Sequence, residues 1–137
     1  MVKQYWINLP VKNLAVSRDF FSKIGFSFDT KFESTDCLSL MVGPQMPPIM
    51  LFLEPTIESF ANSKIADTSS AFEVLISFDA QSKEEVDQFY QKVVATGERI
   101  FSEPAEKDGW MYGFGFEDPD NHRWNMLYMD MEKLPKQ

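Results

Sequence analysis

The sequence predicts an α+β fold built from two copies of one βαβββ module. In each half, a segment of alternating apolar and polar residues precedes a helical stripe of apolar residues. Each predicted helix is followed by a glycine, Gly25 or Gly97, which is typical of a helix end. Because the same order recurs at a nearly constant offset, the pattern indicates duplication. An unrelated pair of ferredoxin-like units is the alternative.

The first strand is expected over residues 4–11, where side chains alternate between two faces. The wholly apolar face should pack on the helix, and its members are Tyr5, Ile7, Leu9 and Val11. The opposite face should be concave, and its members are Gln4, Trp6, Asn8 and Pro10.

Asn13 is expected to cap the first helix, whose apolar stripe ends at Ile24 before Gly25. Residues 26–31, 37–42 and 49–53 read as three further strands. Residues 56–70 lack this patterning and are interpreted as a linker with a short helix around residues 57–62. We therefore expect one domain over residues 1–137, with modules at residues 1–55 and 71–137.

The second module repeats this pattern from residue 71. Residues 71–79 alternate, which should place Phe72 and Phe78 under a helix and Glu73 on the concave side. A capping box at residues 82–85 begins a helix with a strong apolar stripe. Residues 98–101, 110–116 and 122–129 supply the last three predicted strands.

Composition excludes several classes of partner. Thirteen basic and 21 acidic residues give a formal charge of −8, which argues against binding nucleic acid or an anionic membrane. The single cysteine, Cys37, precludes an internal disulfide and suits a reducing cytoplasm. The first residues lack the apolar run of a signal peptide, and no segment approaches a membrane span.

The run Phe-Glu-Asp-Pro-Asp-Asn-His-Arg-Trp-Asn, residues 116–125, predicts a tight hairpin turn at Asp118-Pro119-Asp120-Asn121. It resembles a signature of the vicinal oxygen chelate superfamily, which includes glyoxalases, bleomycin- and fosfomycin-resistance proteins and extradiol dioxygenases. The chain is most similar to its branch of predicted lactoylglutathione-lyase relatives, but has Asn121 for the usual Gly and Asn125 for the usual Glu. The resemblance extends over nearly the whole chain. It implies one cupped, mainly antiparallel eight-stranded sheet with helices on the convex side.

Members of that superfamily carry a divalent metal at four concave positions, which correspond here to Trp6, Met50, Glu73 and Asn125. Only Glu73 is an ordinary ligand for such a cation, because an indole offers no lone pair and a thioether suits soft metals. His122, the one imidazole, falls in the hairpin turn, where the family has a histidine that does not bind metal. We therefore expect no metal or other cofactor beyond a weak divalent cation at Glu73.

The resemblance also implies a concave small-molecule site. Glu73 would be a general base there, since burial beside Trp6 and Met50 would favour its protonated form, and Asn125 would orient an oxygen. The remaining positions would contact the ligand, with the small glycines leaving room: Trp6, Asn8, Met50, Leu75, Met111, Gly113, Gly115 and Leu127. The alternative is that Trp6 and Met50 plug a dead site.

Two functions remain open at this point, both in a homodimer as the resemblance implies. One is a glyoxalase-related lyase or isomerase acting on a small carbonyl or hydroxy compound. The other is a metal-free drug- or metabolite-binding protein similar to the bleomycin-resistance members. The negative charge, Trp6 and Trp110 favour a cationic ligand that bears a ring. A third reading is an inactive paralogue with a role in assembly.

Overall fold

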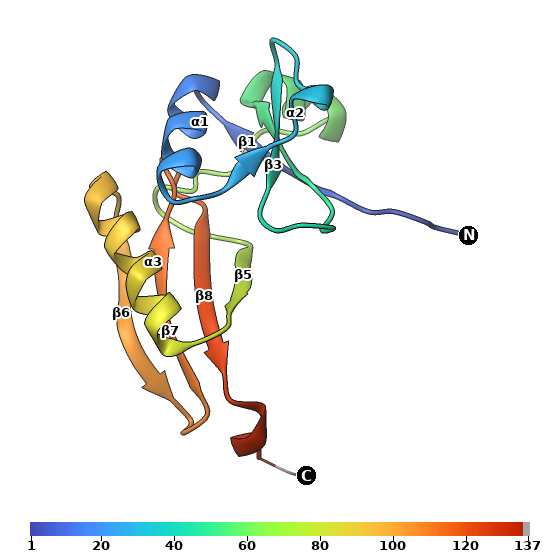
Figure 1. Ribbon diagram of the computed structural model, residues 1–137. Helices are drawn as coiled ribbons and strands as arrows, with labels where there is room; N and C mark the ends of the chain where they lie inside the picture. The colour runs from blue at the N-terminus through green and yellow to red at the C-terminus, as the bar shows by residue number, and fades with distance from the viewer. Residues whose placement is uncertain (136–137) are drawn as a thin grey trace. The chain divides into compact units, whose positions relative to one another are not determined.

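The computed structural model describes residues 1–135, which contain eight strands and three α-helices (Figure 1). The chain divides into two compact units, Met1–Asp67 and Thr68–Gln137, called unit 1 and unit 2 below. Each unit contains one four-stranded mixed sheet with the same strand order. The predicted α+β class with two tandem βαβββ modules is therefore confirmed.

Unit 1 consists of β1 (Ile7–Val11), α1 (Leu14–Lys23), β2 (Ser27–Phe28), β3 (Cys37–Met41), β4 (Ile49–Leu53) and α2 (Glu54–Ala61). A short 3-10 helix, η1 (Thr30–Phe32), lies between β2 and β3. The sheet order is β1-β4-β3-β2, with β1 and β4 parallel and the other pairs antiparallel. Helix α2 starts directly after β4, a few residues before the predicted position.

The core of unit 1 lies between its sheet and α1. Leu9 is 7% exposed and Val11 1% exposed, whereas Trp6 on the alternate face is 55% exposed. Phe20 and Phe21 of α1 are buried too, and the Oδ1 atom of Asn13 accepts a hydrogen bond from the Val16 amide at 3.1 Å. The cap at Asn13 and the burial of Leu9 and Val11 were therefore predicted correctly. Tyr5 and Ile7 were expected on the same buried face but are 70% and 40% exposed, and Tyr5 precedes the first residue of β1.

Unit 2 consists of β5 (Leu75–Ala80), α3 (Lys83–Thr96), β6 (Ile100–Lys107), β7 (Met111–Glu117) and β8 (Arg123–Met129). A 3-10 helix, η2 (Met131–Lys133), follows β8. The sheet order is β5-β8-β7-β6, and α3 lies along one face of this sheet (Figure 1). As in unit 1, the first and last strands of the module are parallel neighbours.

Aromatic rings fill the core of unit 2 under α3. The Phe89 ring of α3 contacts the rings of Phe78 and Phe116, with centroids 5.2 and 6.1 Å apart. Trp124 stacks on Phe116 at 6.4 Å and is fully buried. The predicted capping box is present, since the Ser82 Oγ atom accepts a hydrogen bond from the Glu85 amide at 3.1 Å. Gly97 ends the helix at φ 82°, a conformation that favours glycine.

Four predicted strand boundaries were wrong, and the first is that of β1, which begins at Ile7 instead of residue 4. The strand expected from residue 71 begins at Leu75, because its neighbour β8 begins at Arg123, the partner of Leu75. Phe72 is consequently 57% exposed instead of packing under α3. Strand β6 continues through Pro104 to Lys107, which is tolerated because β6 is an edge strand. In unit 1, the strand expected over residues 26–31 is reduced to β2 and η1.

No helix within residues 1–135 has both the length and the apolar character needed to span a membrane.

Candidate functional site

The hairpin turn between β7 and β8 is organised by the buried carboxylate of Asp118. Its Oδ1 atom accepts hydrogen bonds from the backbone amides of Asp120 (2.9 Å) and His122 (3.1 Å). Its Oδ2 atom accepts one from the Trp124 indole at 3.0 Å. Burial raises the pKa of Asp118 from 3.8 to about 6, against the opposing effect of His122 and these donors. The predicted turn therefore forms, with Asn121 at φ 65°.

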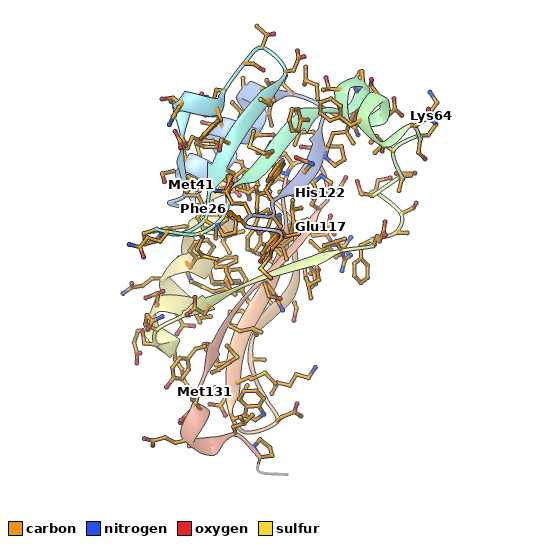
Figure 2. The ribbon with its side chains drawn as sticks, turned by 90° about the vertical axis from the view of Figure 1, so that its right-hand side faces the viewer. Phe26, Met41, Lys64, Glu117, His122 and Met131 are labelled. Carbon is orange, nitrogen blue, oxygen red and sulfur yellow. The ribbon has the colours of Figure 1, made fainter. Side chains whose placement is uncertain are left out.

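Beside this turn, the Glu117 carboxylate is at the centre of a polar network that the sequence did not predict. Glu117 and His122 lie close together at this end of the hairpin (Figure 2). The Glu117 carboxylate pairs with Arg123 at 3.1 Å and accepts a hydrogen bond from the Asn121 side chain at 2.9 Å. The Arg123 guanidinium also lies 4.4 Å from the centroid of the Phe101 ring. The network thus connects Glu117 and Asn121 to Arg123, and Arg123 to the Phe101 ring.

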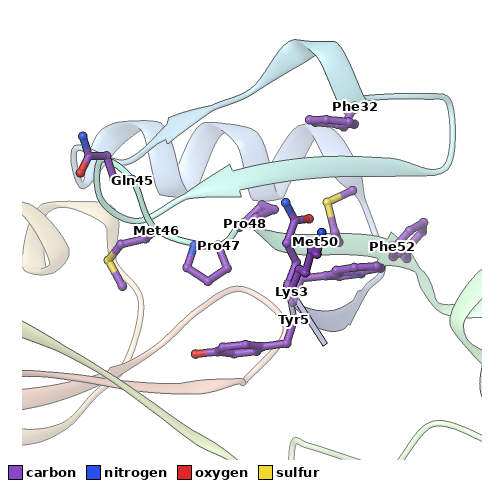
Figure 3. A pocket seen from close by; sticks show the side chains of 11 residues that line it. Lys3, Tyr5, Phe32, Gln45, Met46, Pro47, Pro48, Met50 and Phe52 are labelled. Atoms are coloured by element: carbon purple, nitrogen blue, oxygen red, sulfur yellow. The ribbon is translucent and has the colours of Figure 1, made fainter. Parts of the chain in front are cut away.

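A large cavity of about 730 Å³ lies on unit 1, opposite the helix-packed face of its sheet (Figure 3). Three parts of unit 1 surround it: the N-terminal segment, η1, and β4 with the loop before it. The lining residues are Lys3, Gln4, Tyr5, Trp6, Phe32, Gln45, Met46, Pro47, Pro48, Met50 and Phe52. Trp6 and Met50 both line this cavity. Asn8 pairs with Met50 in the sheet but does not line the cavity.

The walls of this cavity are mostly apolar. Four aromatic rings and two thioethers line it, and the polar contributions come from Lys3, Gln4 and Gln45. One wall is the β3–β4 loop, which Figure 3 shows as Gln45 to Pro48 in succession beside Met50. Pro44, Pro47 and Pro48 restrict this loop, and Gln45 takes a left-handed conformation at φ 60°. A concave apolar site with few polar groups is the usual form of a small-molecule site.

A smaller cavity of about 270 Å³ lies on unit 2 and contains five of the predicted ligand-contacting or catalytic residues. The lining residues are Phe101, Ser102, Ala105, Glu106, Lys107, Met111, Gly113, Phe114, Gly115, Asn125 and Leu127. Gly115 pairs with Asn125 and Gly113 with Leu127 across β7 and β8. The Oδ1 atom of Asn125 is buried and has no hydrogen-bond partner among the described residues.

Gly113 and Gly115 line this cavity, and their role in leaving room for a ligand stays a prediction. A Cβ atom at Gly115 would overlap the Phe101 ring, and one at Gly113 would overlap the Met126 carbonyl and the Leu127 side chain. These glycines make space for the protein's own atoms, because β6, β7 and β8 pack closely there. The sequence analysis did not predict that Phe101 lines this cavity. The one feature of the sequence that could have indicated it is the pair of glycines in β7, which leaves space for a large side chain from a neighbouring strand.

Glu73 and Leu75 line neither cavity. Leu75 is the first residue of β5 and is exposed, and Glu73 lies in the exposed segment before it. A role for Glu73 in proton transfer required a buried carboxylate, and the described residues of one chain do not bury it. The arrangement of Trp6, Met50, Glu73 and Asn125 around one cavity stays a prediction.

The four positions that would hold a metal do not fit a hard or borderline divalent cation. They offer an indole, a thioether, a carboxylate and an amide oxygen. In the part of the chain that the structure describes, no three His, Cys, Asp or Glu side chains gather in a way that would hold a metal ion. The donor chemistry therefore gives no support for a metal-dependent step.

Solved structures from several bacteria share this fold. A hypothetical protein from S. aureus superposes with a TM-score of 0.82 at 27% identity, covering 93% of this chain and 94% of that one. A glyoxalase/bleomycin resistance protein/dioxygenase family enzyme from Burkholderia phytofirmans gives 0.77 at 18% identity, covering 90% and 96%. The fosfomycin resistance protein FosX from Listeria monocytogenes gives 0.69 at 20% identity, covering 97% and 98%. FosX has also been solved with Mn(II) and sulfate.

No curated protein matches the sequence. The family model that matches describes the Glyoxalase/Bleomycin resistance protein/Dioxygenase superfamily, and it covers residues 3–126. That range includes the first module, the second module up to the middle of β8, the hairpin turn at Asp118 and every cavity-lining residue except Leu127. The chain therefore belongs to the Glyoxalase/Bleomycin resistance protein/Dioxygenase superfamily.

Proposed function

We propose that this protein binds a small, largely apolar, ring-bearing molecule in the cavity of unit 1 without the help of a metal ion. The observation that carries the proposal is the cavity itself, about 730 Å³ and walled by aromatic and methionine side chains. Its size falls within the roughly 300–1,000 Å³ range of ordinary ligand pockets. The methionine side chains of Met46 and Met50 suit ligands of irregular shape, because they are flexible and polarizable.

The electrostatics favour a positively charged ligand. The chain carries a net charge of −8, and the faces of the Tyr5, Trp6, Phe32 and Phe52 rings attract cations. Lys3 opposes this preference from the edge of the cavity. The superfamily name includes bleomycin resistance, and FosX is named for fosfomycin resistance, which supports a drug or drug-like metabolite as the ligand class.

The proposal is tested by calorimetric titration with three naphthalene derivatives in buffer containing EDTA. The probes are 1-naphthylmethylammonium, 1-naphthalenemethanol and 1-naphthoate, which share a ring and differ in charge. Affinity should fall in that order, and Trp6→Ala should weaken binding of the cation about tenfold, as for loss of roughly 1.4 kcal/mol. The matched control is Trp110→Phe, since Trp110 lines neither cavity. Absence of binding by all three probes would contradict the proposal.

Catalysis is the second candidate, in which Glu73 moves a proton and Asn125 orients an oxygen of a small carbonyl or hydroxy substrate. The buried, unpartnered Oδ1 atom of Asn125 favours it, and the exposure of Glu73 counts against it. Turnover and ligand affinity of the Glu73→Gln variant distinguish the two functions. A catalytic base would lose turnover with little change in affinity, whereas a binding protein would show no turnover to lose.

We also propose that the protein is a homodimer. Strands β1 and β5 are edge strands of their sheets, and large apolar side chains beside them are exposed, including Trp6, Ile7, Phe72 and Leu75. A second copy that covered them would remove this apolar surface from water. Light scattering at micromolar concentration should give twice the mass of one chain, and a monomer would overturn the proposal.

A further inference from the structure

Residues 1–6, called the N-terminal arm below, form one wall of the unit 1 cavity without being part of the sheet. Residues 3–6 all line the cavity, although β1 begins only at Ile7. In a regular strand successive side chains point to opposite faces, so only alternate residues would line a cavity on one face. The arm therefore borders the cavity as an irregular extended segment that leads away from β1 (Figure 1).

Two prolines explain why the arm does not continue β1. Ile7 pairs with Ile49 in the parallel register of β1 and β4, so a longer β1 would place residues 5 and 6 beside Pro47 and Pro48. Proline has no N–H group to donate to a strand ladder. On its other side, β1 is the edge of the sheet. Residues 1–5 consequently have no hydrogen-bond partner in the part of the chain that the structure describes.

The other walls of the cavity are held more firmly. Strand β4 lies between β1 and β3, and the prolines of the β3–β4 loop restrict its backbone. In the arm, by contrast, Tyr5 is 70% exposed and Trp6 is 55% exposed. Segments with few buried contacts and no ladder hydrogen bonds open at a low cost in free energy. The arm is therefore the wall that moves most easily.

We propose that the N-terminal arm is a lid of the unit 1 cavity, hinged at its junction with β1, and that it closes on the bound ligand through Tyr5 and Trp6. This inference rests on the proposed function of the cavity and identifies the segment that controls entry and release. Opening breaks no ladder hydrogen bond, since Pro47 and Pro48 prevent them. Closure places two aromatic rings against the ligand, and these rings must move away before the ligand leaves.

The first test needs no ligand. Exchange of backbone amide hydrogens with water is measured by NMR at Gln4 and Tyr5, which should exchange nearly as fast as amides of an unstructured peptide. The internal control is the Leu51 amide in β4, which is paired with strands on both sides and should be protected. Protection of the arm amides comparable to that of Leu51 would overturn the proposal.

The second test measures the rates of binding of 1-naphthylmethylammonium by stopped-flow fluorescence in buffer containing EDTA. Deletion of residues 2–5 should raise the dissociation rate about tenfold and the association rate at least about twofold, because a lid obstructs both steps. Tyr5→Ala should raise the dissociation rate about threefold. The matched control is Val94→Ala, which truncates another exposed apolar side chain, on α3 in unit 2, and should leave both rates unchanged.

The association rate distinguishes a lid from a fixed wall. Faster dissociation of the deletion variant with an unchanged association rate would show that the arm only contacts the ligand, and would overturn the proposal. Unchanged rates for both steps would also overturn it, and would leave binding in the unit 1 cavity intact. Absence of binding by the wild type would instead contradict the proposed function, on which the lid rests.

Discussion

The two units use the same strand order but close the connection before their last strand in different ways. In unit 2, Asp118 follows β7 directly, and its carboxylate gathers two backbone amides and the Trp124 indole into a tight turn. In unit 1, the corresponding residue in the repeat is Gly43, which has no side chain that could accept hydrogen bonds from the turn. The connection there is a proline-rich loop that lines the larger cavity (Figure 3).

The cavities of the two units also differ in size. In unit 2, Phe101 fills the space above Gly115 and only about 270 Å³ remains. In unit 1, the rings of Phe32 and Phe52 stand around a cavity of about 730 Å³. The two units therefore share the strand order and a core under the helix. They differ in the residue at the turn and in the side chains on the opposite face of the sheet, and these side chains set the size of the cavity.

The largest expected effect is at the turn carboxylate. Asp118→Ala should lower the free energy of unfolding by about 3–5 kcal/mol, because three buried N–H donors lose their acceptor at once. Gly43→Ala is the matched change in unit 1 and should cost less than about 1 kcal/mol, since the added Cβ meets only the flexible end of Met46. Urea denaturation of both variants makes the comparison. Similar losses for the two would mean that the turns are not organised differently.

The stability contributed by the Asp118 turn of unit 2 should depend on pH, whereas Gly43 at the corresponding position of unit 1 cannot titrate. The folded protein raises the pKa of Asp118 to about 6, so it holds this proton more tightly than the unfolded chain, where the pKa is near 3.8. The stabilising contribution of the group is therefore fully present below pH 3.8 and is lost as the pH rises through about 6. Between these values the wild type should lose about 3 kcal/mol relative to Asp118→Asn, which cannot titrate. Parallel unfolding curves for the two proteins across this range would contradict the assignment.

A smaller effect is expected where Phe101 fills unit 2. Gly115→Ala should cost about 1–3 kcal/mol, because the new methyl group overlaps the Phe101 ring in a packed region. The double variant Gly115→Ala with Phe101→Ala should recover part of that loss, since the overlap is removed. Additive losses in the double-mutant cycle would show that Phe101 does not fill this space.

These contrasts also show how far the sequence alone predicts the molecule. Period-two alternation correctly placed Leu9 and Val11 in the core, because local patterning decides which face a strand buries. It failed at Tyr5, which precedes β1 and is 70% exposed. It failed at Phe72, since the start of β5 depends on where β8 begins rather than on its own pattern. The capping box and the hairpin turn were also predicted, because their hydrogen bonds join residues close in sequence.

The site was harder to predict than the fold. Trp6 and Met50, which line the unit 1 cavity, were singled out through the resemblance. Phe32 and Met46 line the same cavity but were not predicted, because η1 and the β3–β4 loop have no periodic signal. The filling of Gly115 by Phe101 depends on a β-bulge between two strands, which no single segment encodes. Side chains that meet across irregular backbone are thus the ones that sequence patterns leave undetermined.

The most direct test of the central claim is an NMR titration of ¹³C-methyl-labelled methionines with 1-naphthylmethylammonium in buffer containing EDTA. Met46 and Met50 line the unit 1 cavity, whereas Met111 lines the unit 2 cavity and serves as an internal control. The signals of Met46 and Met50 should shift and saturate together, while that of Met111 stays in place. Shifts that are absent, or that appear only after Zn²⁺ or Mn²⁺ is supplied in excess of EDTA, would contradict metal-independent binding in unit 1.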